Sequence, residues 1–173
     1  MSFHPSKSRI AALSAFVTLA LTAPAMAELA MPAGDVILTI DGAITHTNSP
    51  DGANFDMDML QVMPASGFET TSTWTVGKNR YDGVPLKALL DAVGATGGTI
   101  TATALNNYSV QIPIEAIEDS VPIVAYHIDG APFSRRDKGP LWIVFPYDMG
   151  PEYQTEQVYG WSIWQLAGLT IVD

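Results

Sequence analysis

Three cations stand within four residues of one stretch in a chain that is otherwise acidic. Arg135, Arg136 and Lys138 precede Gly139-Pro140, a pair that favours a turn, and an apolar run follows. A turn of this composition can present guanidinium groups and backbone amides to an anion or to a ligand rich in hydrogen-bond acceptors. The alternative is a solvated basic loop in front of a core strand, because charge clusters usually face water.

A tryptophan in polar surroundings is the second feature that suits ligand binding. Trp74 lies in the Thr- and Ser-rich residues 71–75, and Gly77-Lys78-Asn79-Arg80 follow. A flat heterocycle can stack on such a ring, and a half-buried strand explains the same pattern equally well. Trp142, by contrast, lies in the run 141–145, which is apolar on both faces and predicts core packing.

The patterns that mark self-contained enzymes are mostly missing. His46 and His127 do not stand in a metal-ligand spacing such as HxxxH or HExxH, and neither GxSxG nor a glycine-rich phosphate loop occurs. The acidic residues within 115–119 have the pattern of a solvated helix face. The absence of cysteine removes thiolate nucleophiles and thiolate metal ligands. The sequence therefore favours a protein without catalysis of its own, although it does not decide the question.

The N-terminus has the pattern of a secretory signal peptide. Lys7 and Arg9 supply the positive region, residues 10–21 the apolar region, and Ala25-Met26-Ala27 the small-x-small cleavage pattern. We expect cleavage after Ala27 and a periplasmic protein without membrane insertion, in which residues 28–173 form a single domain. The two basic residues are not an adjacent arginine pair, so we expect export of an unfolded chain, which cannot carry a cofactor inserted beforehand.

The composition of residues 28–173 limits the partners. This part holds six Lys and Arg against 18 Asp and Glu, which gives a net charge of −12. Such a charge argues against nucleic acid or anionic lipid as a partner. Without cysteine there are no disulfides, so the fold must be stabilised by packing.

Short strands separated by Asp-Gly and Gly-Gly turns, with two or three short helices, predict an α+β fold built on a mixed sheet or barrel. Asp41-Gly42 and Asp129-Gly130 predict tight hairpins, because a type I′ turn needs positive φ at both central residues. The clearest helix is expected over residues 84–93, with Pro85 in its first turn and Gly94 at its end. Other helices are expected at 56–62, 114–119 and 158–164, and strands at 35–40, 43–45, 68–76, 99–105, 108–112, 123–128, 141–145 and 169–172.

Three segments follow one another in an order that is typical of one family. They are YDGVPLKALLDAVGA at 81–95, ALNNYSVQIPIEAI at 104–117 and PIVAYHIDGAPFSRRDKGPLWIVFPYD at 122–148. This order resembles the oxidoreductase molybdopterin-binding domain of the sulfite-oxidase type, above all its small stand-alone periplasmic members. The resemblance runs from about Gly34 to the C-terminus and implies the sulfite-oxidase fold, a compact α+β domain.

The resemblance also implies a ligand and a role. Enzymes of that family bind molybdenum through a cysteine before the GVPL helix, and the corresponding residues 71–77 contain none. We therefore expect a pterin, reduced or not, without molybdenum. Small cysteine-less members look like pterin-binding proteins of the periplasm, and some of them are linked to membrane-bound enzymes of cyclic-di-GMP turnover. The resemblance therefore implies, as a partner, the periplasmic domain of such a sensor or signalling enzyme. The alternatives are a subunit of a molybdopterin-dependent oxidoreductase and a ligand-free adaptor protein.

The family's pterin pocket implies a set of contacts in this chain. Trp74 is expected to stack on the pterin, with Asn106 and Tyr108 at the edge of its ring. Tyr147 is expected at the rim, and Trp161 either closes one side of the pocket or packs. On the side opposite Trp74, the cations of the basic turn are expected to hold the pterin carbonyl or a polar tail: Arg135, Arg136 and Lys138.

Overall fold

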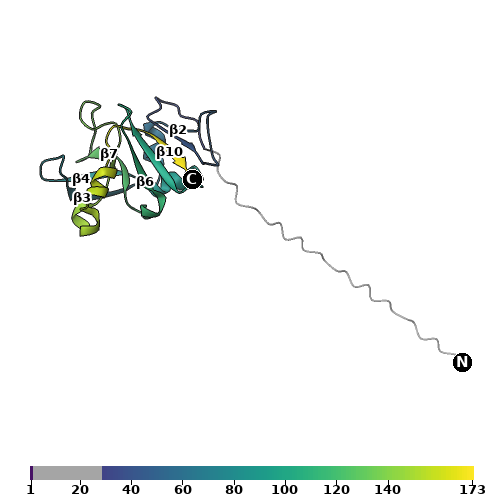
Figure 1. Cartoon of the computed structure of the whole chain (residues 1–173). Helices are drawn as coiled ribbons and strands as arrows, with labels where there is room; N and C mark the ends of the chain where they lie inside the picture. The colour runs from purple at the N-terminus through teal and green to yellow at the C-terminus, as the bar shows by residue number, and fades with distance from the viewer. Residues whose placement is uncertain (2–28) are drawn as a thin grey trace.

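The computed structural model describes residue 1 and residues 29–173 (Figure 1). The described chain contains three α-helices and three 3-10 turns: α1 (Met57–Val62), α2 (Leu86–Ala92), α3 (Glu156–Trp161), η1 (Ile114–Ala116), η2 (Tyr147–Met149) and η3 (Pro151–Tyr153). Its strands are β1 (Leu38–Gly42), β2 (Ala53–Phe55), β3 (Ser66–Thr71), β4 (Lys78–Pro85), β5 (Thr99–Ala104), β6 (Ser109–Pro113), β7 (Ile123–Ile128), β8 (Ala131–Pro132), β9 (Trp142–Val144) and β10 (Leu166–Val172).

The strands form two sheets. The first has the order β2-β1-β10-β5-β6, and the second has the order β3-β4-β7-β8, with β9 also paired to β7. The pair β1 and β10 is parallel, whereas the neighbouring pairs of both sheets are antiparallel. The predicted α+β fold with a mixed sheet is confirmed.

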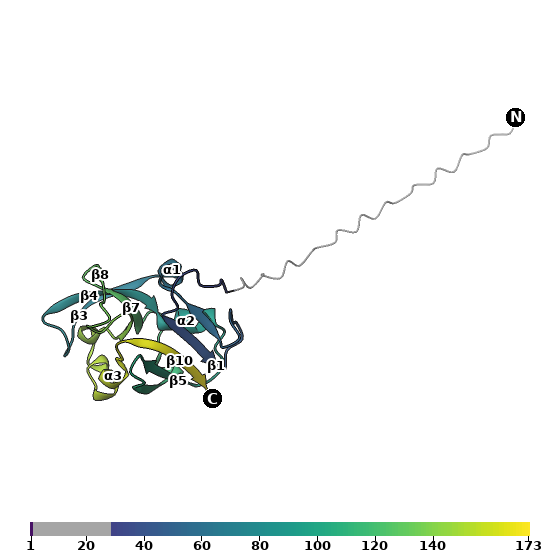
Figure 2. The same ribbon diagram turned by 90° about the horizontal axis from the view of Figure 1, so that it is seen from above.

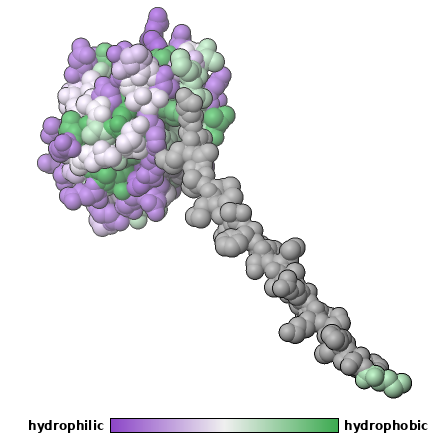
Figure 3. Space-filling view, turned by 90° about the vertical axis from the view of Figure 1, so that its right-hand side faces the viewer, coloured by the Kyte–Doolittle hydropathy of each residue, from purple (hydrophilic) through white to green (hydrophobic). Residues whose placement is uncertain are grey.

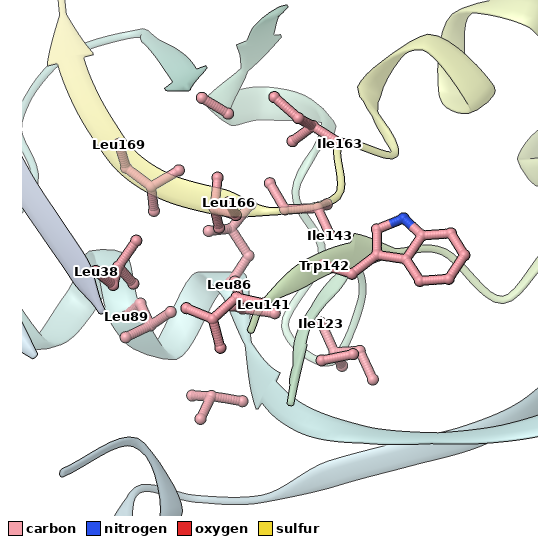
Figure 4. Packing of buried hydrophobic residues seen from close by; sticks show 14 of the residues in the cluster. Leu38, Leu86, Leu89, Ile123, Leu141, Trp142, Ile143, Ile163, Leu166 and Leu169 are labelled. Carbon is pink, nitrogen blue, oxygen red and sulfur yellow. The ribbon is translucent and has the colours of Figure 1, made fainter. Parts of the chain in front are cut away.

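The core fills the space between the sheets and α2. Leu86 and Leu89 on the apolar stripe of α2 are fully buried and point toward residues of β1, β9 and β10 (Figure 4). Trp142 in β9 is also fully buried, as its run of apolar neighbours predicts. Truncating a buried leucine of this kind typically costs about 2–5 kcal/mol, so these contacts hold the sheets in place.

One of the two predicted hairpins is wrong. Asp129 and Gly130 have φ of 49° and 77° and join β7 to β8, as the type I′ pattern predicts. Gly42 instead ends β1, and the next residue, Ala43, donates from its N–H to the Ile171 carbonyl of β10 at 2.8 Å. A Cβ on Gly42 would lie 2.1 Å from that carbonyl oxygen, so the glycine permits a close approach of two strands rather than a reversal.

Several predicted bounds shift because caps and turns override the periodicity. The strand predicted over 68–76 ends at Thr71, and residues 72–77 form a turn. The helix predicted over 158–164 begins at Glu156, because the Thr155 hydroxyl accepts from the Val158 N–H at 3.2 Å and caps it. The helix expected over 114–119 is the single turn η1.

The helix expected over 56–62 is confirmed as α1. Its N-cap, Asp56, also binds backbone N–H groups outside the helix. Asp56 accepts from the Met59 N–H at 2.9 Å and from the N–H groups of Ala33 and Gly34, each at 2.7 Å. These backbone hydrogen bonds hold the pKa of Asp56 below its ordinary value. The carboxylate therefore fastens the start of the described segment onto α1.

The predicted signal peptide and its cleavage site lie almost entirely within residues 2–28, outside the described residues. In residue 1 and residues 29–173, no helix is both long and apolar enough to cross a membrane. On the face shown in Figure 3, apolar residues reach the surface as patches between hydrophilic ones. Figures 1 and 2 place α3 at the end of the molecule where β3 and β4 project, and this end carries the site described next.

Candidate functional site

Trp74 is positioned by a tightly fastened turn, which we call the Trp74 loop (residues 72–77). The hydroxyls of Ser72 and Thr75 lie 2.7 Å apart, and the Thr75 hydroxyl is 3.1 Å from that of Tyr81. Gly77 closes the loop with φ of 73°, a conformation that glycine adopts without strain. These contacts turn the Trp74 ring inward from the end of β3.

A carboxylate anchors the base of this loop. Asp148 accepts from the Thr71 hydroxyl at 2.6 Å and from the Thr71 N–H at 2.9 Å, and its own N–H donates to the Thr70 hydroxyl at 3.0 Å. The two hydrogen bonds from Thr71 hold the pKa of Asp148 below its ordinary value. The end of β3 is thereby tied to η2, a segment 77 residues further along the chain.

The Trp74 ring is the centre of an aromatic cluster. Its centroid lies 5.7 to 6.1 Å from the rings of Trp142, Tyr147, Tyr159 and Trp164, in edge-on geometry in each case. The hydroxyl of Tyr147, a buried member of the cluster, donates to the Ser162 hydroxyl at 2.6 Å, and burial raises the pKa of Tyr147 strongly. The cluster joins residues from the Trp74 loop, β9, η2, α3 and the segment after α3 into one wall.

One side of this wall faces a cavity of about 370 Å³, which we call the aromatic cavity. The turn between β5 and β6 supplies Asn106 and Tyr108, where the Asn106 side chain accepts from the Tyr108 N–H at 3.0 Å. Asn107 at the tip of that turn has a left-handed φ of 66°. The lining residues are Trp74, Ala104, Asn106, Tyr108, Tyr159, Gly160, Ser162, Ile163, Trp164 and Gln165.

A second cavity of about 350 Å³, the basic cavity, adjoins the first at three residues. It is lined by Trp74, Trp164 and Gln165, which also line the aromatic cavity, and by residues 136–138 of the basic turn (residues 134–138). The Lys138 ammonium lies 2.8 Å from the Asp137 carboxylate and 5.9 Å from the Trp142 ring centroid, within the range of a cation–π contact.

Gln165 holds the basic turn against the aromatic cavity. Its side-chain amide donates to the Arg135 carbonyl at 2.7 Å, and its N–H donates to the Lys138 carbonyl at 3.0 Å. Its carbonyl accepts from the Leu105 N–H at 2.9 Å, and its backbone has a left-handed φ of 52°. One residue thus connects the two loops that border the site.

The positive charge of the described chain is concentrated at this end. Of the six Lys and Arg in residues 29–173, all except Lys87 lie on β4 or on the basic turn. Arg80 pairs with Asp82 at 2.9 Å, whereas neither Arg135 nor Arg136 forms an ion pair with a described residue. The basic turn can therefore give a free guanidinium to an anionic or acceptor-rich group.

The structure brings most of the predicted site residues together. Trp74, Asn106 and Tyr108 line the aromatic cavity, and Arg136 and Lys138 line the basic one. The remaining three are placed elsewhere. Of these, Arg135 contributes its carbonyl to the Gln165 contact, Tyr147 is buried beneath Trp74 instead of standing at the rim, and Trp161 lines neither cavity and packs on Phe145 at 6.2 Å.

Sequence reasoning missed Tyr159, Gly160, Trp164 and Gln165 as site residues. They belong to α3 and to the segment after it, where only a turn of helix is expected from the pattern. A signal was present for Trp164, because this ring stands next to the polar Gln165 much as Trp74 stands among polar neighbours. Gln165 has no local signal, because its partners are 27 to 60 residues away in sequence.

The donor set suits an organic ring better than a metal ion. In the described part of the chain, no three His, Asp or Glu side chains gather in an arrangement that could hold a metal, and the sequence contains no cysteine. Aromatic faces, amide groups and guanidinium groups do gather here, and these bind flat heterocycles that are rich in donors and acceptors.

The two adjoining cavities lie at one end of an α+β fold, and comparison with known proteins identifies the family of this domain. Residues 44–153 match the model of the oxidoreductase molybdopterin binding domain, so the chain belongs to that family. The solved structure of the sulfane dehydrogenase SoxCD from Paracoccus pantotrophus shares the fold, with a TM-score of 0.59 and 18% sequence identity. The match covers 79% of this chain and 38% of the SoxCD chain. No curated protein matches.

Proposed function

We propose that this protein binds a pterin cofactor, with the bicyclic ring in the aromatic cavity and the carbonyl edge or polar substituent toward the basic cavity. The observation that carries the proposal is the meeting of the two cavities at Trp74, Trp164 and Gln165. A pterin is flat on both faces and has donors and acceptors around its edge. Aromatic walls next to Asn106 and a free Arg136 guanidinium complement both properties.

The family membership supports an oxidoreductase context for this binding. The family is described by its binding of molybdopterin, and the structural relative is a dehydrogenase. The match covers 38% of that relative's chain, so the relative's whole activity is not carried over to this protein. We therefore place the protein as the pterin-holding component of an oxidoreductase system, which was the alternative in the sequence analysis, ahead of the signalling role.

The metal content of the ligand is a separate part of the proposal. The family's description favours a molybdopterin-type ligand, which counts against the expectation that the pterin is free of molybdenum. The donor set of this chain counts in favour of that expectation, because there is no cysteine to supply a thiolate. We propose that the chain's own residues hold the pterin and do not ligate a metal. The bound pterin would supply a ring that exchanges electrons and protons.

Relay of the ligand state to a membrane-bound enzyme of cyclic-di-GMP turnover is the second candidate, and it rests on the resemblance described above. It requires periplasmic export and contact with the periplasmic domain of an inner-membrane protein. Affinity capture of membrane proteins with and without added pterin tests it. A partner retained only in one ligand state supports the relay, and an unchanged set of captured proteins contradicts it.

The binding test is a titration of tetrahydrobiopterin against wild type, Trp74→Ala and Arg136→Ala. Removing a charge-assisted contact costs about 1.5–3 kcal/mol, which is about tenfold or more in Kd. Loss of the stacking ring costs about 1 kcal/mol beyond lost contact area, so a similar weakening is expected for Trp74→Ala.

Arg135→Ala is the matched control, because this neighbouring arginine lies in the same turn but its side chain lines neither cavity. Its Kd should stay within about twofold of wild type. If Trp74→Ala and Arg136→Ala bind as tightly as wild type, the site lies elsewhere and the basic turn is a solvated loop.

A further inference from the structure

A glycine inside α3 has no explanation within the chain itself. Gly160 is the fifth of the six residues of this helix, where glycine is less favourable than alanine because it orders a more flexible backbone. Glycine in such a place is usually explained by positive φ or by a close approach of other protein atoms. The Gly160 backbone is not in the positive-φ region. The helix cap, Ser162, has φ of −80°, so this is not a left-handed cap either.

Close packing is also excluded for Gly160. Apart from its two chain neighbours and the backbone of its own helix, no atom lies within 4 Å of the place where a Cβ would stand. Other glycines of the chain differ, since a Cβ on Gly83 would lie 2.2 Å from the Val124 carbonyl oxygen, and one on Gly139 would lie 2.4 Å from that of Phe133. Those glycines are needed by neighbouring strands and loops, whereas Gly160 borders open space.

Gly160 is exposed and stands at the border of the aromatic cavity. Gly160 lines this cavity beside Tyr159, and Trp74 and Trp164 line it as well. The Tyr159 and Trp164 rings each lie within 6 Å of the Trp74 ring, at 5.8 and 5.7 Å between centroids. A side chain at position 160 would therefore stand at the border of this cavity, next to a ring bound among these aromatic residues.

We infer that Gly160 determines specificity: its missing side chain keeps the α3 wall clear, so that the edge of a flat, fused bicyclic ligand lies against the main chain of α3. The inference rests on the proposed function and adds a shape requirement to it. Ligands whose α3-facing edge is flat and unsubstituted fit. A methyl group on either partner at this contact weakens binding by overlap, and a larger group weakens it more.

The test is a size series at two glycines, with Kd for tetrahydrobiopterin and the melting temperature as paired readouts. Gly160→Ala and Gly160→Leu are compared with Gly98→Ala and Gly98→Leu. Gly98 is the matched control, because it too has open space around its Cβ position and no positive φ, and it lines neither cavity. Gly160→Leu should raise Kd by about tenfold or more and Gly160→Ala by a smaller factor, without loss of melting temperature. Both Gly98 variants should bind like wild type.

The outcomes separate this inference from the proposed function. If wild type binds and both Gly160 variants bind equally well, the inference is overturned and the proposed function stands. If the Gly160 variants melt well below the corresponding Gly98 variants, the chain itself needs the glycine, and the inference is overturned on that ground. If wild type does not bind tetrahydrobiopterin, the proposed function fails at the first step and the inference fails with it.

Discussion

Trp74→Ala should destabilise the protein even when no ligand is present. The indole is half-buried and contacts four aromatic rings edge-on, with centroids 5.7 to 6.1 Å away. Each such pair contributes about 0.5–1.5 kcal/mol beyond its buried area, and pairs that share one ring do not add fully. Truncating a fully buried tryptophan costs about 3–5 kcal/mol, so we expect about 2–4 kcal/mol for this half-buried one.

Thermal unfolding followed by far-UV circular dichroism measures this effect. For a domain of this size about 1 kcal/mol shifts Tm by roughly 2–4 °C, so Trp74→Ala should lower Tm by roughly 5–15 °C. Trp74→Phe should lower it less, because a smaller ring keeps part of the cluster. Val76→Ala serves as the control in the same loop, since Val76 is 97% exposed and its loss should change stability by less than about 0.5 kcal/mol. A Tm for Trp74→Ala within about 2 °C of wild type would refute the aromatic cluster as described.

Three further predictions concern the basic turn, the contact between Asp148 and Thr71, and the N-terminus. Arg135→Ala and Arg136→Ala should each change the free energy of unfolding by less than about 0.5 kcal/mol in the absence of ligand, because both side chains are exposed. Urea titration measures this free energy. A large decrease for either variant would mean that the side chain stabilises the fold. Asp148 has a lowered pKa, so its stabilising contribution is present above its ordinary value of 3.8 and is lost as the pH falls through the lowered pKa. Asp148→Asn should therefore reduce Tm at neutral pH, with a difference from wild type that narrows in acid; a difference independent of pH would contradict this. N-terminal sequencing of the exported protein should begin at Glu28, and retention of Met1 in that fraction would exclude cleavage after Ala27.

The parts of the site that local sequence determines could be predicted. The basic turn lies where the cation cluster and Gly139-Pro140 place it, because turn chemistry acts over a few residues. The β7–β8 hairpin follows from Asp129-Gly130 for the same reason. The identical dipeptide Asp41-Gly42 misleads, because the approach of β10 from the far end of the chain decides how Gly42 is used.

The assembled site depends on contacts that no local pattern contains. The sequence pattern predicts that Trp74 lies in a strand, but β3 ends at Thr71. Hydroxyl contacts of Thr75 with Ser72 and Tyr81 form a loop instead and turn the Trp74 ring inward. Tyr147 follows a strand and reads as a rim residue, but a hydrogen bond to Ser162 keeps its hydroxyl satisfied while it is buried. Gln165 borders both cavities only because it reaches the basic turn 30 residues earlier in the chain.

The most direct test of pterin binding is an analysis of the small molecules that the native protein carries. Protein purified under oxygen-free conditions is denatured, and the released small molecules are examined by fluorescence and mass spectrometry, with elemental analysis of the same sample. We predict a pterin in near-stoichiometric amount and no molybdenum in proportion to it. Molybdenum that rises in step with the pterin would contradict the metal-free part of the proposal, and a preparation that neither carries nor takes up any pterin would contradict the account as a whole.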